Sequence, residues 1–147
     1  MQTGKIRAIC ISEKKGTEKH SVPSAEINDK GIAGDAHAGD WHRQVSLLSY
    51  DEVMKFKNAN PQVKIEDGAF GENLLIEGID LCKPKIGAKV TIGKVELEIT
   101  QIGKECHGDG CTIFRAVGKC IMPKIGLFSK VIGTGTIKTG DEVKYFD

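Results

Sequence analysis

The segment that most constrains the fold is AKVTIGKVELEIT, residues 88–100, because its apolar and polar residues alternate. The alternation is interrupted only at Gly93-Lys94, and the apolar positions on either side are Val90, Ile92, Val95, Leu97 and Ile99. Strict alternation is typical of a strand with one buried face, and a two-residue break between two such runs predicts a β-hairpin.

Several other short apolar runs lie between glycine-rich turns and are also expected to be strands. They are 4–12, 24–28, 44–49 and the middle of 66–81. The end of the chain, 135–146, reads as a last hairpin around Thr139-Gly140-Asp141. Eighteen glycines against four prolines fit a chain with many turns. About seven short strands predict a mostly β domain, a closed or half-closed β-barrel.

Two or three short helices are expected beside these strands. Ser49 followed by Glu52 is a capping-box pattern that predicts a helix start, with Val53 and Phe56 facing the core. A second helix is expected over 111–118, where apolar residues recur at helical spacing and Gly118 is a plausible C-cap.

Composition limits the class of protein. A chain of 147 residues is expected to form a single domain over 1–147 that needs no disulfide staples. A formal net charge of +1 without blocks of like charge argues against nucleic acid or a membrane surface as partner. The N-terminus does not have the order of a signal peptide, so a cytoplasmic protein with reduced thiols is expected. Five cysteines, an odd number, also disfavour a full disulfide framework.

The glycine-rich segment 29–43, DKGIAGDAHAGDWHR, has no periodicity and is expected to be a loop. Its glycines permit a close approach of backbone to ligand, and Asp35, His37, His42 and Arg43 supply charge and hydrogen bonds. The segment is not a Walker A motif, although the planar Arg43 guanidinium suits phosphate or carboxylate. The alternative is a loop whose charges are merely solvated.

The segment 104–111, KECHGDGC, concentrates metal-ligating and nucleophilic residues. Cys106, His107, Cys111 and Cys120 could bind zinc, but no CxxC pair is present and adjacent Cys-His side chains rarely converge on one ion. A reactive thiol fits better, because Lys104 and His107 flank Cys106 and nearby cations lower a thiol pKa. No structural zinc is therefore expected. Cys10 and Cys82 are expected to be bystanders.

Several of these segments, taken in chain order, resemble the motifs of the molybdenum cofactor sulfurase C-terminal (MOSC) domain. They are GIAGDAHAG…RQVSLLS, FGENLLIEGIDL…IGAKVTIG and LEITQIGKEC, and the resemblance covers roughly residues 25 to 145, in the small stand-alone bacterial form. It implies a MOSC barrel, similar to the pyruvate kinase barrel. It also implies a cysteine that carries sulfur or meets the molybdenum of a pterin cofactor.

Carried over by position, the resemblance implies two sets of site residues. The reactive set is Cys106, which would also be the molybdenum ligand, with Cys111, Cys120, His107 and Lys104 beside it. The cofactor-binding set is Gly34, Asp35, His37, Arg43, Gln44, Gly71, Glu72 and Asn73. Many family members carry a Pro-Arg pair a few residues before the cysteine, where this chain has Ile102-Gly103-Lys104. Lys104 and Arg43 are the candidate replacements for the arginine that would bind the pterin phosphate.

Three functions stay open at this point. The first is a sulfur carrier that forms a cysteine persulfide and delivers sulfur to a molybdenum/pterin centre, with molybdopterin bound tightly or only transiently. Its partners would be a pyridoxal-phosphate-dependent cysteine desulfurase or other sulfur donor, and a molybdenum cofactor or molybdoenzyme acceptor. The second is a molybdenum-cofactor-binding oxidoreductase that reduces N-hydroxylated compounds with an external electron donor. The third is a barrel that binds a small ligand non-covalently.

Overall fold

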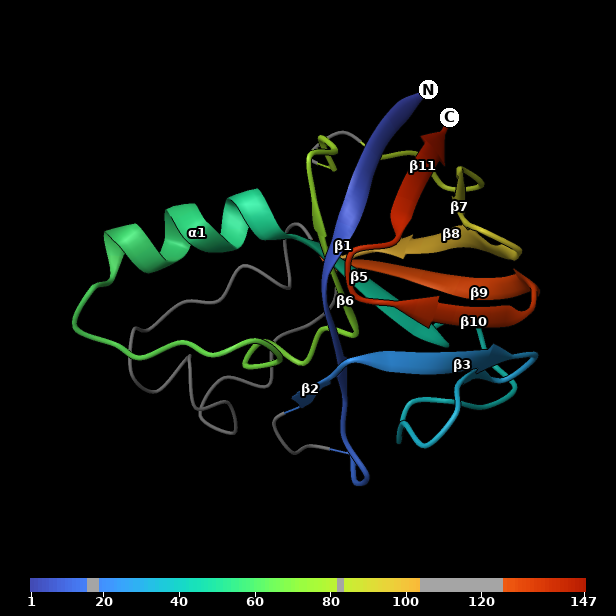
Figure 1. The fold of residues 1–147 in the computed structure, drawn as a ribbon, viewed down its shortest axis with the longest axis horizontal. Helices are drawn as coiled ribbons and strands as arrows, with labels where there is room; N and C mark the ends of the chain where they lie inside the picture. The colour runs from blue at the N-terminus through green and yellow to red at the C-terminus, as the bar shows by residue number, and fades with distance from the viewer. Residues whose placement is uncertain (16–18, 82–83, 104–125) are drawn as a thin grey trace.

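The structure is a computed structural model that describes residues 1–15, 19–81, 84–103 and 126–147. Its described elements are, in chain order, β1 (Gln2–Ile11), β2 (His20–Val22), β3 (Ser24–Asn28), β4 (Gly31–Ile32), β5 (Val45–Ser49), α1 (Tyr50–Ala59), β6 (Leu74–Glu77), β7 (Lys89–Ile92), β8 (Val95–Ile102), β9 (Leu127–Gly133), β10 (Gly135–Lys138) and β11 (Glu142–Phe146). Figure 1 shows strands as the main regular elements of the described chain, with α1 extending to one side. The mostly β prediction is confirmed.

Seven strands close into a barrel in the order β11-β7-β8-β9-β5-β6-β1, and pairing of β11 with β1 completes the ring. Neighbouring strands are antiparallel except β5 and β6, which run parallel because α1 lies between them in the chain. The long strand β1 serves three partners in turn, pairing with β11, β6 and β2 along its length. The closed form of the predicted barrel is therefore the correct one.

The part of the barrel wall beside α1 separates two apolar clusters. Most buried isoleucines, leucines and valines fill the interior, whereas a smaller outer cluster lies under α1 and the loop that follows it. In β1 an irregularity between Ile6 and Ala8 changes the alternation. Ile6 and Ile9 consequently face the interior, while Ala8 and Cys10 join the outer cluster. A bulge of this kind lets one long strand serve both cores.

The single helix among the described residues, α1, begins as the sequence predicts. The Ser49 hydroxyl accepts a hydrogen bond from the Glu52 N–H at 3.3 Å, and acidic residues occupy the first turn. This bond satisfies one of the backbone donors left unpaired at a helix start. Val53 and Phe56 are buried, as expected, and Phe56 meets Phe70 edge to face. The helix expected over 111–118 lies outside the described residues.

The predicted hairpin over 88–100 is confirmed. Strands β7 and β8 pair antiparallel with Ile92 opposite Val95, so that Gly93 and Lys94 form the turn. The alternating residues of β8, Val95, Leu97 and Ile99, are all buried. The side chains between them are more exposed, and Glu98 there forms ion pairs with Lys89 and Lys130.

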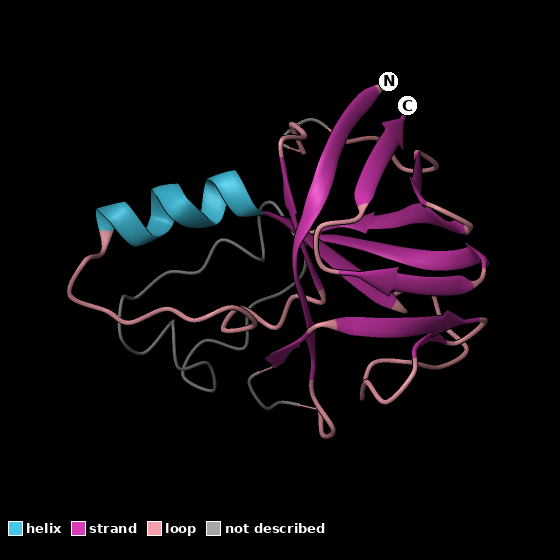
Figure 2. Cartoon of the chain, in the orientation of Figure 1, coloured by secondary structure: helices cyan, strands magenta, loops and turns pink. Residues whose placement is uncertain are grey.

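The predicted last hairpin is wrong. A turn does form at Thr139-Gly140, with the Asp141 N–H donating to the Lys138 carbonyl at 3.0 Å. However, β10 pairs with β3 in a separate three-stranded sheet, whereas β11 pairs with β7 and β1 in the barrel. The backbone of Ile6 bonds to both Gly140 and Asp141, which fixes the turn against β1. Because β1 occupies the place beside β11, the two arms of the turn diverge (Figure 2).

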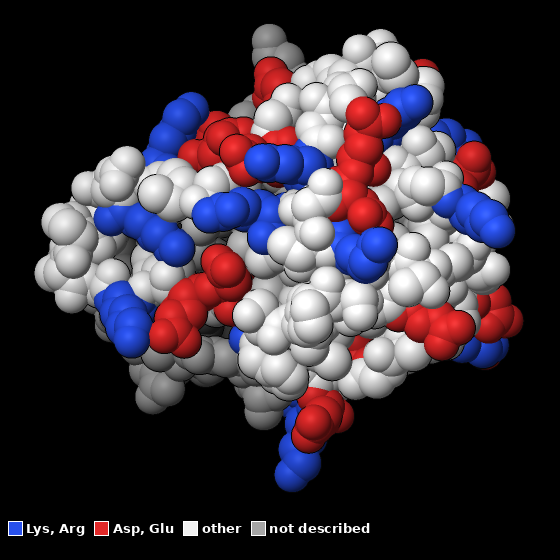
Figure 3. All heavy atoms as spheres, viewed as in Figure 1, with Lys and Arg blue, Asp and Glu red and all other residues white. Residues whose placement is uncertain are grey.

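The segment 29–43 is mostly turns and bends, as expected, but it contains the two-residue strand β4 against β3. On the face of the molecule drawn in Figure 3, basic and acidic side chains are interspersed and neither sign gathers into a large patch. No helix among the described residues is both long and apolar enough to cross a membrane.

Candidate functional site

A buried ion pair joins Lys19 to Asp35 in the middle of the glycine-rich segment. The Lys19 Nζ atom is 2.6 Å from Asp35 Oδ1, and the two side chains are only 1% and 0% exposed. The same ammonium lies 3.2 Å from the Ser12 hydroxyl and 3.0 Å from His37 Nδ1. Three N–H groups thus meet three different neighbours. Lysine is almost never fully buried unless it is paired in this way.

Asn73 connects this ion pair to the barrel wall. Its Nδ2 donates to Asp35 Oδ2 at 3.2 Å and to the Cys10 carbonyl at 3.0 Å. Its Oδ1 accepts from the N–H and the hydroxyl of Ser46. The side chain therefore links β1, β5 and the glycine-rich segment, and its amide is fully used by the protein.

The surroundings of Asp35 favour its ionised form. Burial by itself would raise the pKa of the carboxyl group, but hydrogen bonds from Lys19, the Ser12 N–H and Asn73 lower the pKa overall. Lys19 is held in place through its backbone, since its N–H bonds to the Gly68 carbonyl at 3.3 Å. A Cβ atom at Gly68 would lie 2.2 Å from the Lys19 carbonyl oxygen, so only glycine permits this approach.

An aromatic and cationic cluster adjoins the ion pair. The Trp41 indole lies nearly parallel to the His37 ring, with 6.5 Å between the ring centroids. The indole N–H donates to the His37 carbonyl at 2.8 Å. The Arg43 guanidinium lies 4.8 Å from the Trp41 ring centroid, and the Lys15 ammonium lies 5.4 Å from it. Arg43 also lies over Phe128 of β9. The contacts run without a break from Asn73 through Asp35, His37 and Trp41 to Arg43.

The two cations of this cluster, Arg43 and Lys15, form no ion pair with a described carboxylate. Stacking uses the face of a guanidinium and leaves its N–H groups at the edge, where they suit an anionic oxygen. The pair is therefore a candidate anion-binding element at the rim of the buried network.

The end of β8 lies against the same loop. His42 Nε2 is 2.7 Å from Gln101 Oε1, and the Thr100 hydroxyl bonds to the His42 carbonyl. The N–H of Gly103 bonds to the Gly126 carbonyl at 2.7 Å. These contacts bring the last described residue before segment 104–125 to the neighbourhood of the aromatic and cationic cluster.

The side chains of Glu72 and Gln44 form hydrogen bonds with backbone groups of the described structure. The two oxygens of the buried Glu72 carboxyl accept from the N–H groups of Gly68 and Phe70, at 2.8 and 3.1 Å. Burial raises the pKa of Glu72 to about 7, although these hydrogen bonds by themselves lower it. The Gln44 amide donates to the carbonyls of Asp29 and Gly39 and accepts from Val131. A direct role of either residue toward a cofactor stays a prediction.

Gly34 and Gly71 both have a positive φ, 86° and 82°. Apart from their chain neighbours, no atom of the described residues lies within 4 Å of the place a Cβ would take at either glycine. The backbone conformation therefore explains why these positions are glycine. Their proposed contact with a cofactor also stays a prediction.

Cys10 is fully buried in the outer cluster. Burial, and to a smaller extent the charge of Glu72, raises the pKa of its thiol, which makes it a poor nucleophile. Its dispensability for sulfur chemistry stays a prediction. The other reactive candidates, Lys104, Cys106, His107, Cys111 and Cys120, and also Cys82, lie outside the described residues. The described residues contain no cluster of three or more His, Cys, Asp or Glu suited to a metal.

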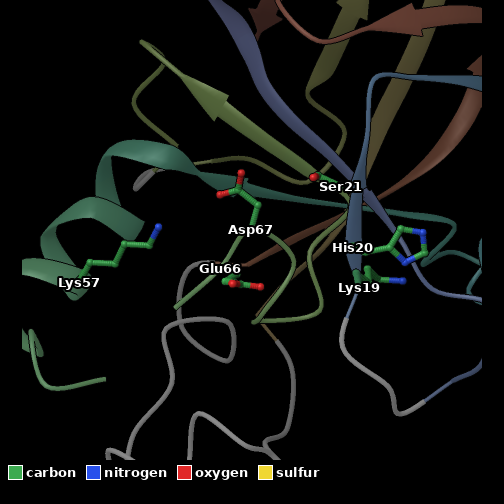
Figure 4. Close-up of a pocket in the computed structure, with 6 residues that line it drawn as sticks. All are labelled: Lys19, His20, Ser21, Lys57, Glu66 and Asp67. Atoms are coloured by element: carbon green, nitrogen blue, oxygen red, sulfur yellow. The ribbon is translucent and has the colours of Figure 1, made fainter. Parts of the chain in front are cut away.

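A groove of ≈ 440 Å³ opens between α1, β2 and the loop before β6, and Lys19 of the buried ion pair is one of its lining residues. Figure 4 shows Lys57 reaching toward it from α1 and Glu66 and Asp67 from that loop, with His20 and Ser21 on the other side. The groove carries charges of both signs, and none of the site residues predicted from the sequence lines it. It therefore adds nothing to the predicted site.

Sequence reasoning did not find Lys19, Ser12, Lys15 or Trp41. Lys19 belongs to the charged segment 13–20, which looks solvated and gives no periodic signal. Trp41 could have been noticed, because it is the single tryptophan of the chain and lies between His37 and His42, two positions before Arg43.

Comparison with known proteins agrees with this architecture. The model of the MOSC domain family matches residues 34–144. The chain belongs to the MOSC domain family. The match covers the site segments 34–44 and 71–73, and it ends within β11.

Solved structures show the same fold for this MOSC domain at low sequence identity. The YuaD protein from Bacillus subtilis is 19% identical with a TM-score of 0.81, and the alignment covers 99% of this chain and 98% of that one. YiiM from Geobacillus stearothermophilus is 15% identical with a TM-score of 0.74, over 98% and 75% of the two chains. YiiM from Escherichia coli is 17% identical with a TM-score of 0.67, over 97% and 70%. No curated protein matches the chain.

Proposed function

We propose that this MOSC domain is a sulfur carrier associated with the molybdenum cofactor, and that Cys106 carries the sulfur. Membership of the MOSC family is the observation that carries the proposal, since proteins of this family are associated with that cofactor. The sequence adds support, because Cys106 comes three positions after Gly103, the last described residue of that stretch.

The chemistry requires a thiolate and a persulfide donor. The Cys106 thiolate attacks the outer sulfur of the donor, a new S–S bond forms to Cys106, and the S–S bond of the donor breaks. The donor leaves as a thiolate and Cys106 becomes a persulfide, so no further oxidant is needed. Delivery of that sulfur to a molybdenum/pterin acceptor as sulfide, a suitable soft ligand, would require two electrons. Two thiols of an external reductant would form a disulfide, the S–S bond at Cys106 would break, and Cys106 would return to the thiolate.

The residues at the site fit the phosphate of a pterin cofactor. Arg43 and Lys15 have no acidic partner among the described residues, and both lie beside the half-buried Trp41. These groups would bind the phosphate and cover an aromatic ring system. When bound, the cofactor supplies the molybdenum that receives sulfur. Arg43 would then replace the arginine that this chain lacks before Cys106.

The test measures sulfur on individual cysteines. The purified protein is treated with cysteine persulfide, alkylated and mapped by mass spectrometry, and Cys106→Ser is compared with Cys10→Ala. The expected result is a sulfane adduct on Cys106 that is lost in Cys106→Ser and kept in the folded Cys10→Ala protein.

Two results would overturn the proposal. One is an adduct that persists at the wild-type level in Cys106→Ser, with Cys111→Ser and Cys120→Ser then identifying the true carrier. The other is stoichiometric molybdenum with a fluorescent pterin on protein from a cofactor-producing host, without any adduct. That second result would favour the reductase.

A further inference from the structure

Three acceptors surround the Lys19 ammonium, and they determine the state of His37. An ammonium group has three N–H donors and no lone pair. The Lys19 Nζ contacts are Ser12 Oγ at 3.2 Å, Asp35 Oδ1 at 2.6 Å and His37 Nδ1 at 3.0 Å. Each acceptor therefore takes one proton.

Lys19 is charged in this arrangement because its nearest neighbour is an ionised carboxylate. Asp35 accepts hydrogen bonds from the Ser12 N–H at 3.0 Å and from Asn73 at 3.2 Å as well as from Lys19. These bonds lower the pKa of the carboxyl despite its burial. An ammonium beside it compensates the charge, whereas a neutral amine would leave a buried carboxylate without its cation.

From these contacts we infer that Lys19 is a positioning residue that fixes His37 as the neutral tautomer with its proton on Nε2. His37 Nδ1 must accept the Lys19 proton, so the ring can carry its own proton only on the other nitrogen. With its proton on Nε2 the imidazole is a hydrogen-bond donor at that atom, and a donor of this kind suits an anionic sulfur or oxygen atom as its acceptor. Nothing in the sequence motifs assigned a role to Lys19.

The packing around His37 holds the ring in this orientation. The backbone N–H of His37 donates to Asp35 Oδ2 at 3.3 Å, and the backbone carbonyl accepts from the Trp41 indole. The imidazole ring lies nearly parallel to the indole. The His37 side chain is 34% exposed, in contrast to the buried Lys19 and Asp35. The Nδ1 edge of the ring is thus engaged by the buried pair, while part of the side chain is exposed. The role of the donor in sulfur transfer rests on the function proposed above.

The first experiment reads the tautomer without any sulfur chemistry. Long-range ¹H–¹⁵N correlation spectra of the labelled protein, with His37 assigned by mutation, distinguish a protonated from a bare ring nitrogen. The expected wild-type result is protonated Nε2 and bare Nδ1. In Lys19→Met the ring should become a mixture of both tautomers.

Two further variants keep this experiment decisive. Because Lys19→Met leaves Asp35 buried without its cation, Lys19→Met/Asp35→Asn removes both charges and should show the same mixture in a folded protein. Lys30→Met is the matched control, since Lys30 pairs with Asp40 at the surface of the same segment. A wild-type His37 protonated on Nδ1, or an unchanged tautomer in the folded double variant, would overturn the inference.

The second experiment tests the donor. A glutamine amide nitrogen mimics imidazole Nε2, and an asparagine amide nitrogen mimics Nδ1. His37→Gln should therefore retain more of the sulfur-loading rate on Cys106 than His37→Asn does. An equal loss of loading rate in both variants would show that His37 does not act as a hydrogen-bond donor in sulfur loading. The tautomer assignment from the first experiment would not be affected. Loading that does not depend on Cys106 would instead refute the proposed function.

Discussion

Two lysine–aspartate pairs involve the same glycine-rich segment, yet they differ in almost every physical respect. Lys19 and Asp35 are 1% and 0% exposed at the side chain, whereas Lys30 and Asp40 are 46% and 82% exposed. The buried pair is surrounded by Ser12, His37 and Asn73. The exposed pair is surrounded mainly by solvent.

The difference shows that surroundings, and not residue type, decide what an ion pair does. The buried charges cannot be screened by water, so each depends on its partners and in turn orders them. The exposed charges keep most of their hydration whether or not they meet. Only the buried pair can therefore fix the proton of a neighbouring histidine.

The largest expected effect comes from removing the buried cation. Lys19→Met keeps most of the aliphatic packing but leaves the Asp35 carboxylate buried without its cation. The free energy of unfolding should fall by about 3–5 kcal/mol, the usual range for breaking a buried pair. Chemical denaturation followed by circular dichroism measures it. A loss too small to detect would show that water or another cation reaches Asp35.

A second buried carboxylate, Glu72, sharpens the comparison because it has no lysine partner. Its pKa is raised to about 7 from an ordinary 4.5, mainly by burial. The folded protein therefore holds this proton to higher pH than the unfolded chain does. The stabilising contribution is complete below pH 4.5 and is lost as pH rises to about 7, by at most on the order of 3 kcal/mol.

Asp35 should show the opposite dependence. Its pKa is lowered from 3.8 by its hydrogen-bond donors, so its contribution is present above that value and is lost as pH falls through the lower folded value. Denaturation curves for the wild type and Glu72→Gln between pH 4.5 and 7 separate the two effects. The variant should lose the slope, and Glu66→Gln, an exposed carboxylate of the same loop, should keep it. Parallel slopes in the wild type and Glu72→Gln would contradict the prediction.

The smallest effect is expected for the exposed pair. Lys30→Met should leave the denaturation midpoint within experimental error, because surface ion pairs lose little hydration and are screened by salt. The same denaturation assay at low and high salt checks this. A loss comparable to that of Lys19→Met would mean that the two pairs do not differ as described.

Local patterns predicted much of the fold. The alternation over 88–100 gave the β7–β8 hairpin with its turn, and Ser49 with Glu52 gave the start of α1. Both depend on interactions between residues close in the chain, which the sequence displays directly. The turn at Thr139-Gly140 was also predictable, but the pairing of its two arms was not. That pairing depends on Ile6, which lies more than a hundred residues away.

By itself, the sequence determined the strand-rich pattern, the helix cap and the ordered motifs that point to the MOSC family. It also singled out Asp35, His37 and Arg43 as candidates. Only the tertiary structure decided that Lys19, 16 positions before Asp35, and Asn73, 38 positions after it, converge on that carboxylate. The physical reason is that closing the barrel brings β1 beside β6 and excludes water between them. A charged residue in a segment that looks solvated becomes a buried ion-pair partner only after that closure.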